Sequence, residues 1–153
     1  MKSVQISIFK IFDIFCAALM IIGVAITVRI PAYADQSDPQ LDDLFSALQG
    51  GPSETQAAKL ELEIWARWTD HPYDPLANRQ MVKGIKLMNF GDLGAAEAVF
   101  SRVIHSHPNF AEAWNKRATV RFFRGNHSGS IGDILQVIKL EPRHFGALSG
   151  LGM

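Results

Sequence analysis

The sequence repeats itself with a 34-residue period, from about Asn78 through the remainder of the chain. Many residues at this spacing are identical or alike. The pairs are Gly84 with Ala118, Gly91 with Gly125, Asp92 with Asn126, Val103 with Val137, Ile104 with Ile138 and Pro108 with Pro142. A fixed period of this length predicts a solenoid, in which each unit packs on its neighbours. Such a solenoid more often holds another molecule than performs catalysis.

The repeated residues have clear roles in a unit of two helices joined by a turn. Gly91 and Gly125 can adopt the left-handed conformation that ends a helix. The residues that follow them, Asp92 and Asn126, can accept hydrogen bonds from the free amides of the next helix. Each unit then has a proline that stops its second helix, because proline has no amide hydrogen. The sequence therefore predicts the same turn in both units.

This pattern resembles the tetratricopeptide repeat. The segments 114–119 and 143–152 also resemble exported bacterial proteins of that family whose role is undefined, and the resemblance spans nearly all of the chain after Ala34. It implies an all-α solenoid of helix-turn-helix units, with two full repeats at 77–110 and 111–144. A truncated start of a third repeat is expected at 145–153.

Residues 35–76 contain helix signals of their own. A helix over 41–48 is closed by two glycines, and a second helix over 53–69 begins at Ser53, which Gln56 complements in a capping box. The second helix has a broad apolar stripe that includes two tryptophans, so it must be buried against another surface. We expect this helix pair to form one cap of the repeat array, followed by a linker.

The N-terminal segment 1–34 is typical of an export signal. Lysines precede an apolar stretch at 14–28, and the sequence Ala-Tyr-Ala at 32–34 fits cleavage after Ala34. The apolar stretch is shorter than the ~20 residues of a membrane-spanning helix. We therefore expect a cleaved signal and a periplasmic or secreted protein. The alternative is an uncleaved anchor in the inner membrane over residues 11–30, which would be the only membrane contact.

The sequence shows no arrangement of groups that would perform catalysis. Cys16, the single cysteine, lies in the apolar N-terminal stretch, so the remainder has no thiol. His105 and His107 lack the carboxylate or thiolate that would complete a four-ligand metal site. We expect no enzymatic activity, no cofactor, no metal site and no nucleic-acid partner.

In the tetratricopeptide family the first helix of each unit lines a concave wall, where a partner peptide or helix lies. The resemblance therefore implies an adaptor or scaffold for protein–protein interaction in the cell envelope. The implied partner-binding residues are Asn78, Met81, Ile85, Met88, Asn115, Lys116, Thr119 and Phe122. Another interpretation of the two methionines and the isoleucine is that they are core residues packed against the N-terminal helices.

Two other functions remain open. The chain could be a truncated, structural or vestigial product without a specific ligand. It could also bind an anionic polymer, because residues 77–153 carry ten basic and five acidic residues. The anionic contact candidates are Arg117, Arg121 and Arg124. The simpler explanation for the first two is that their stems pack while their charged ends reach solvent or an acid such as Asp133.

The residues that begin the third repeat also suggest self-association. Its apolar side chains would need a neighbour, which another subunit could supply. These residues are Phe145, Leu148 and Leu151.

Overall fold

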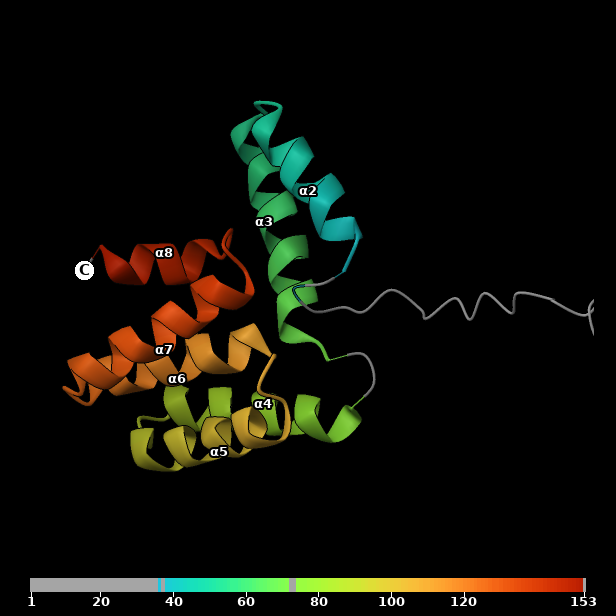
Figure 1. Ribbon diagram of the computed structural model, residues 1–153. Helices are drawn as coiled ribbons and strands as arrows, with labels where there is room; N and C mark the ends of the chain where they lie inside the picture. The colour runs from blue at the N-terminus through green and yellow to red at the C-terminus, as the bar shows by residue number, and fades with distance from the viewer. Residues whose placement is uncertain (1–35, 37, 72–73, 153) are drawn as a thin grey trace, which may run out of the picture. The chain divides into compact units, whose positions relative to one another are not determined.

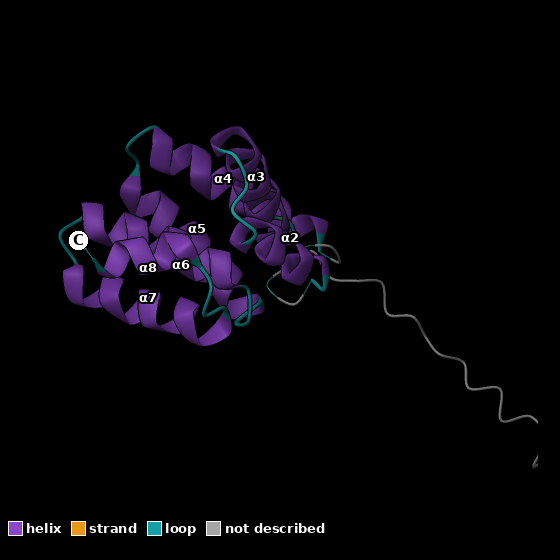
Figure 2. Ribbon diagram, turned by 90° about the horizontal axis from the view of Figure 1, so that it is seen from above, coloured by secondary structure: helices purple, strands orange, loops and turns teal. Residues whose placement is uncertain are grey.

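The computed structural model describes residue 36, residues 38–71 and residues 74–152 of the chain. Within these ranges the chain forms helices and no strand (Figures 1 and 2), which confirms the expected all-helical fold. None of the described helices has the length and apolar character needed to cross a membrane. The predicted export signal and its cleavage after Ala34 lie outside the described residues.

The first helical pair precedes the repeats. Helix α2 spans Gln40–Gln49 and α3 spans Glu54–Thr69. Gly51 between them has a φ of 72°, and Ser53 and Gln56 form the expected capping box at the start of α3. The pair is held together by a small core of Leu41, Ile64 and Trp68.

The repeat units are two antiparallel helix pairs and the start of a third. The first unit consists of α4, Pro75–Asn89, and α5, Leu93–Ser106. The second consists of α6, Ala111–Phe123, and α7, His127–Leu140. Helix α8, Phe145–Leu151, follows. Figure 1 shows these pairs stacked in chain order, with α6 next to α5 and α8 next to α7.

Both turns have the conformation that the sequence predicts. Gly91 and Gly125 have φ values of 82° and 76°, which only glycine adopts without strain. The Oδ1 atom of Asp92 accepts a hydrogen bond of 3.1 Å from the amide of Ala95. The Oδ1 atom of Asn126 accepts one of 3.0 Å from the amide of Gly129. The two N-caps are therefore equivalent.

The helices of the first repeat approach each other closely. A Cβ atom added at Gly84 of α4 would lie only 2.5 Å from the ring of Phe100 on α5. Phe100 is fully buried, in a core shared with Met81, Val103 and residues at the start of α6. Glycine is therefore needed at this position because the phenylalanine ring occupies the space of a side chain.

The N-terminal pair lies against α6 and the start of α8. The ring of Trp68 stacks on His144, with a centroid distance of 4.1 Å and an interplanar angle of 9°. Trp65 meets the edge of Phe145 at 5.1 Å, and a Cβ atom at Gly146 would lie 2.7 Å from the Trp65 ring. A cap on the first repeat would instead cover α4. The aromatic side chains of α3 instead bring this pair against α6 and the start of α8.

Candidate functional site

The arginines of α6 are bound within the chain. Arg117 donates two hydrogen bonds of 2.8 and 2.9 Å to Asp133 and a third to Ser101. Arg121 lies 3.0 Å from the same carboxylate, which is 3% exposed. Two guanidinium groups therefore enclose one buried acid between α6 and α7.

A second acid forms ion pairs with Arg121 and Arg124. Glu97 of α5 accepts a 2.9 Å hydrogen bond from Arg121 and also pairs with Arg124. The hydrogen bond from Arg121 holds the pKa of Glu97 below its ordinary value. The assignment of Arg117, Arg121 and Arg124 as anionic contacts is therefore corrected, since each of the three guanidinium groups is paired with an acid of the same chain.

A buried polar cluster occupies the first turns of α6. Glu112 is fully buried, and its carboxylate accepts a hydrogen bond of 2.9 Å from Asn115. The amine of Lys116 lies 2.9 Å from the same carboxylate and 5.2 Å from the centre of the Trp65 ring. Asn115 and Lys116 were predicted to contact a partner; here both bind Glu112, and Lys116 also lies over Trp65 of α3.

His144 completes this cluster. Its Nδ1 atom accepts a 3.3 Å hydrogen bond from the amide of Ala147, at the start of α8. Its Nε2 atom must then carry the proton and donate to Glu112, 3.1 Å away. Burial by itself would raise the pKa of Glu112, but the bond from His144 and the charge of Lys116 lower it below its ordinary value. The cluster joins α3, α6 and α8.

The residues of α4 that were predicted to contact a partner also bind other parts of the same chain. Asn78 accepts a 2.6 Å hydrogen bond from the amide of His71 and donates to the carbonyl of the same residue. Met81 is fully buried in the core, so its assignment to an open binding surface is wrong. Ile85 and Met88 are partly buried against that core, which consists of residues from α4, α5 and α6 and not from the N-terminal helices.

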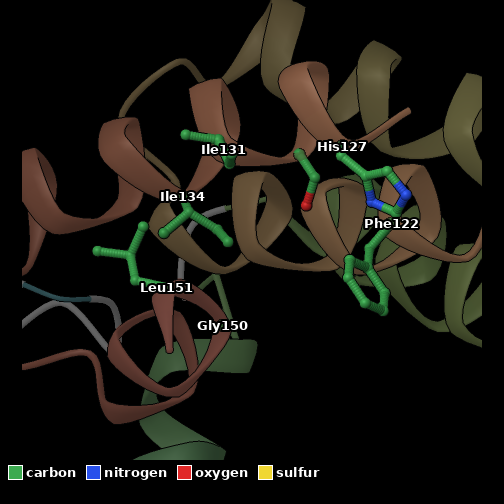
Figure 3. Close-up of a pocket in the computed structure, with 7 residues that line it drawn as sticks. Phe122, His127, Ile131, Ile134, Gly150 and Leu151 are labelled. Carbon is green, nitrogen blue, oxygen red and sulfur yellow. The ribbon is translucent and has the colours of Figure 1, made fainter. Parts of the chain in front are cut away.

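The open surface lies further along α6, where it meets α7 and α8. Two adjoining hollows of about 250 and 160 Å³ share Phe122, Ser130, Ile134 and Gly150. Asn115 and Thr119 line the smaller one. We call this surface the α6–α8 groove. Figure 3 shows its larger end, where Phe122 and His127 lie on one side and Ile134 and Leu151 on the other.

The groove offers apolar contact rather than free polar groups. The hydroxyl of Thr119 donates to the carbonyl of Asn115, and that of Ser130 donates to the carbonyl of Ala118. Phe122, Ile131 and Leu151 remain 37%, 50% and 47% exposed. Among the described residues, no group of three acidic, histidine or cysteine side chains could hold a metal ion. The arrangement suits the binding of apolar side chains.

Sequence reasoning found only part of this groove. It predicted Asn115, Thr119 and Phe122 on α6, but it missed the residues that α7 and α8 contribute. One signal was available, because Ile131 stands one repeat period after the charged Glu97. An apolar residue that replaces a charged one in a repeat and is 50% exposed indicates a function specific to that repeat.

The third-repeat residues are divided between two environments. Phe145 is partly buried against Trp65 and Trp68, so its proposed role in self-association is corrected. Leu148 and Leu151 are each 47% exposed. Leu151 lines the groove, while Leu148 does not.

Comparison with known proteins gives one informative match. The chain is 38% identical over 112 residues to a TPR repeat-containing protein of Rhizobium etli. The match includes 73% of this chain and 54% of the relative, so the chain spans about half the length of that curated protein. No protein-family model matches the chain, and no solved structure does. Together with the repeated turns and the stacked helix pairs, the similarity shows that the chain is related to the tetratricopeptide repeat family.

Proposed function

We propose that this chain is a non-catalytic scaffold that binds a segment of a partner protein in the α6–α8 groove. The observation that carries the proposal is the partial exposure of Phe122, Ile131 and Leu151 around two adjoining hollows. Apolar side chains gathered in a hollow on a protein surface are typical of binding sites. Proteins with tetratricopeptide repeats generally bind other proteins, which supports the same class of function.

The chemistry of the groove suggests what the partner presents. Its hydroxyl groups are already bound to backbone carbonyls, so hydrogen bonding adds little. We expect the partner to insert apolar side chains between Phe122 and Leu151. The affinity should then depend weakly on salt, because no free charge lines the hollows.

The first test is photo-crosslinking in the cell. A photoreactive phenylalanine analogue is placed at Ile131, which lines the groove, or at Leu135, one turn further along α7. Leu135 is a matched control because it is 56% exposed but does not line the groove. We expect one main protein adduct at position 131 and little at 135. Equal labelling at both positions, or none, contradicts the proposal and favours a product without a specific ligand.

The second test measures affinity for the crosslinked partner after its purification. Ile131→Asp places a carboxylate in the groove and should weaken binding by about ten-fold or more, or about 1.4 kcal/mol. Leu135→Asp should leave binding within about two-fold. Both side chains are at least half exposed, so circular dichroism should show unchanged helix content.

We also propose that the scaffold acts in the cell envelope after export. The support is the sequence alone: an apolar stretch at 14–28 followed by Ala-Tyr-Ala at 32–34. Mass spectrometry of the protein from cell fractions tests this, with an N-terminus at Asp35 in the periplasmic fraction expected. An intact N-terminus in the membrane fraction would favour the anchor over residues 11–30, and a cytoplasmic protein would contradict export.

A further inference from the structure

Helix α4 carries an exposed basic surface that the groove does not use. Its members are Arg79, Val82, Lys83, Lys86 and Phe90, which we call the α4 basic face. Val82 is 51% exposed and Phe90 is 87% exposed. The opposite side of the same helix is buried in the core through Ala77, Met81 and Gly84.

The charges of this face are not neutralised within the described part of the chain. Helix α4 contains no acidic residue, and no ion pair between described residues involves Arg79, Lys83 or Lys86. The arginines of α6, in contrast, are all paired. A shallow, open depression of about 380 Å³ is lined by the basic side chains together with Val82, Leu87 and Phe90. The face therefore combines free positive charge with apolar contact area.

The second repeat shows what covers this face when a helix is present. The residues one period later than Arg79, Lys83 and Lys86 are Ala113, Arg117 and Val120. Ala113 and Val120 are fully buried, in a core that includes Val103 and Ile104 of α5. Arg117 reaches Ser101 of α5. On α6, then, this face packs against the helix that precedes it in the array.

Helix α5 also shows which side chains a helix needs in order to pack against this face. Its contacts with α6 come from Glu97, Ser101 and Ile104, whose spacing of four and then three positions puts them on one helical face. The carboxylate of Glu97 binds the guanidinium groups of Arg121 and Arg124. A helix that fits α4 should present carboxylates at this spacing to the three bases, with apolar side chains between them for Val82 and Phe90.

We propose that the α4 basic face binds an acidic amphipathic helix of a partner protein, in the place that α5 takes beside α6. The repeat relation favours a protein over a lipid surface, because the matching face of α6 is covered by the helix α5. Three basic residues would also contribute only about 1 kcal/mol each at an anionic membrane. The proposal rests on α4 alone and does not depend on the α6–α8 groove.

Fluorescence anisotropy with the full chain tests the proposal. The probe is a labelled, helix-stabilised peptide with glutamates and leucines at the spacing of Glu97, Ser101 and Ile104. The control peptide has glutamine in place of every glutamate. We expect only the acidic peptide to bind, and we expect its affinity to fall as the salt concentration rises.

Matched variants assign the binding to α4. Lys83→Glu should weaken binding by about ten-fold, and Phe90→Ser should weaken it through lost apolar contact. Lys139→Glu makes the same charge change at an exposed lysine of α7 and should have no effect. Ile131→Asp, which alters the groove, should also leave this binding unchanged. A peptide with one lysine, in place of the glutamate that faces position 83, should regain affinity for the Lys83→Glu chain.

Four results would overturn the proposal. The first is equal binding of the glutamine peptide, and the second is no binding of either peptide. The third is stronger binding of phosphatidylglycerol vesicles or of polyphosphate, lost in Lys83→Glu, which would assign the face to an anionic surface or polymer. The fourth is a concentration-dependent dimer of the chain itself, abolished by Lys83→Glu in sedimentation velocity, which would assign the face to a second copy.

Discussion

The two repeats share one backbone plan but have different interiors. In each, a glycine with positive φ and a capping Asp or Asn join the two helices. Between α4 and α5 the contact is apolar and close, with the Phe100 ring against Gly84. Between α6 and α7 the contact contains a buried carboxylate, that of Asp133, held by two guanidinium groups. The same helix pair can therefore be joined by apolar packing alone or by apolar packing together with a buried ion pair.

Residues related by the repeat show where the difference arises. Val99 stands one period before Asp133, and Lys83 stands one period before Arg117. Lys83 is exposed, yet the side chain of Arg117 is only 12% exposed, because α5 and α7 lie beside it. The period determines which side of the helix a residue occupies. The neighbouring helix determines whether that side is core or surface.

The largest expected effect is at the ionic interface. Asp133→Ala leaves Arg117 and Arg121 without their shared carboxylate and should lower the free energy of unfolding by about 3–5 kcal/mol. Urea denaturation followed by circular dichroism measures the loss. The corresponding change in the first repeat, Val99→Ala, should lower it by less, since it removes only a small apolar group.

Converting the ionic interface to an apolar one provides the control. The triple variant Asp133→Val, Arg117→Leu, Arg121→Leu replaces the charged groups by a valine and two leucines. The first repeat has Val99 and Leu87 at the positions that match 133 and 121. We expect the triple variant to recover most of the stability lost in Asp133→Ala, because replacing a whole buried ion cluster by apolar residues is often neutral or stabilising. A triple variant less stable than Asp133→Ala would show that the charges are essential to the packing.

A smaller effect is expected at the close apolar contact. Gly84→Ala introduces a Cβ atom at 2.5 Å from the Phe100 ring and should destabilise the chain by about 1–3 kcal/mol. The second repeat has Ala118 and Ile134 at the matching positions. Adding Phe100→Ile to Gly84→Ala should therefore restore part of the loss in a thermal melt. If Gly84→Ala alone stabilises the chain, the greater helix propensity of alanine outweighs the clash.

The helix caps should respond equally in the two repeats. Asp92→Ala and Asn126→Ala each remove one hydrogen bond of similar length to a helix amide, so each should lower stability by about 1 kcal/mol. Urea midpoints of the single and double variants measure this, and the two effects should add. A marked difference between the two would mean that the caps are not equivalent despite their shared geometry.

Acidification should affect the second repeat without any mutation. The pKa of Glu112, beside His144 and Lys116, is lower in the folded chain than its ordinary value of 4.5. Its stabilising contribution is therefore present above that pH and is lost as the pH falls through the folded pKa. The matching residue of the first repeat, Asn78, does not titrate. Stability should change little down to about pH 5 and fall below it. In Glu112→Gln this fall should be smaller, as urea melts at neutral pH and about pH 3 would show.

Much of the fold could be predicted because its signals are local. Gly91 with Asp92, and Gly125 with Asn126, place two turns at one period, and a turn needs only its own residues. The groove was predicted in part, because Phe122 and Thr119 lie on the helix that lines the concave face in the family. Met81 was placed there wrongly, because an apolar residue on an inward face looks the same in sequence whether a partner or the core covers it.

The sequence by itself determined the helix pairs, their turns and the register of the repeat, since backbone conformation and capping depend on neighbouring residues. Only the tertiary structure decided the partners of the charged side chains. It paired Arg117 and Arg121 with Asp133, left Lys83 without an ion pair among the described residues, and stacked Trp68 on His144. These pairings join residues far apart in the chain, and their energies depend on burial, which becomes defined only when the helices pack.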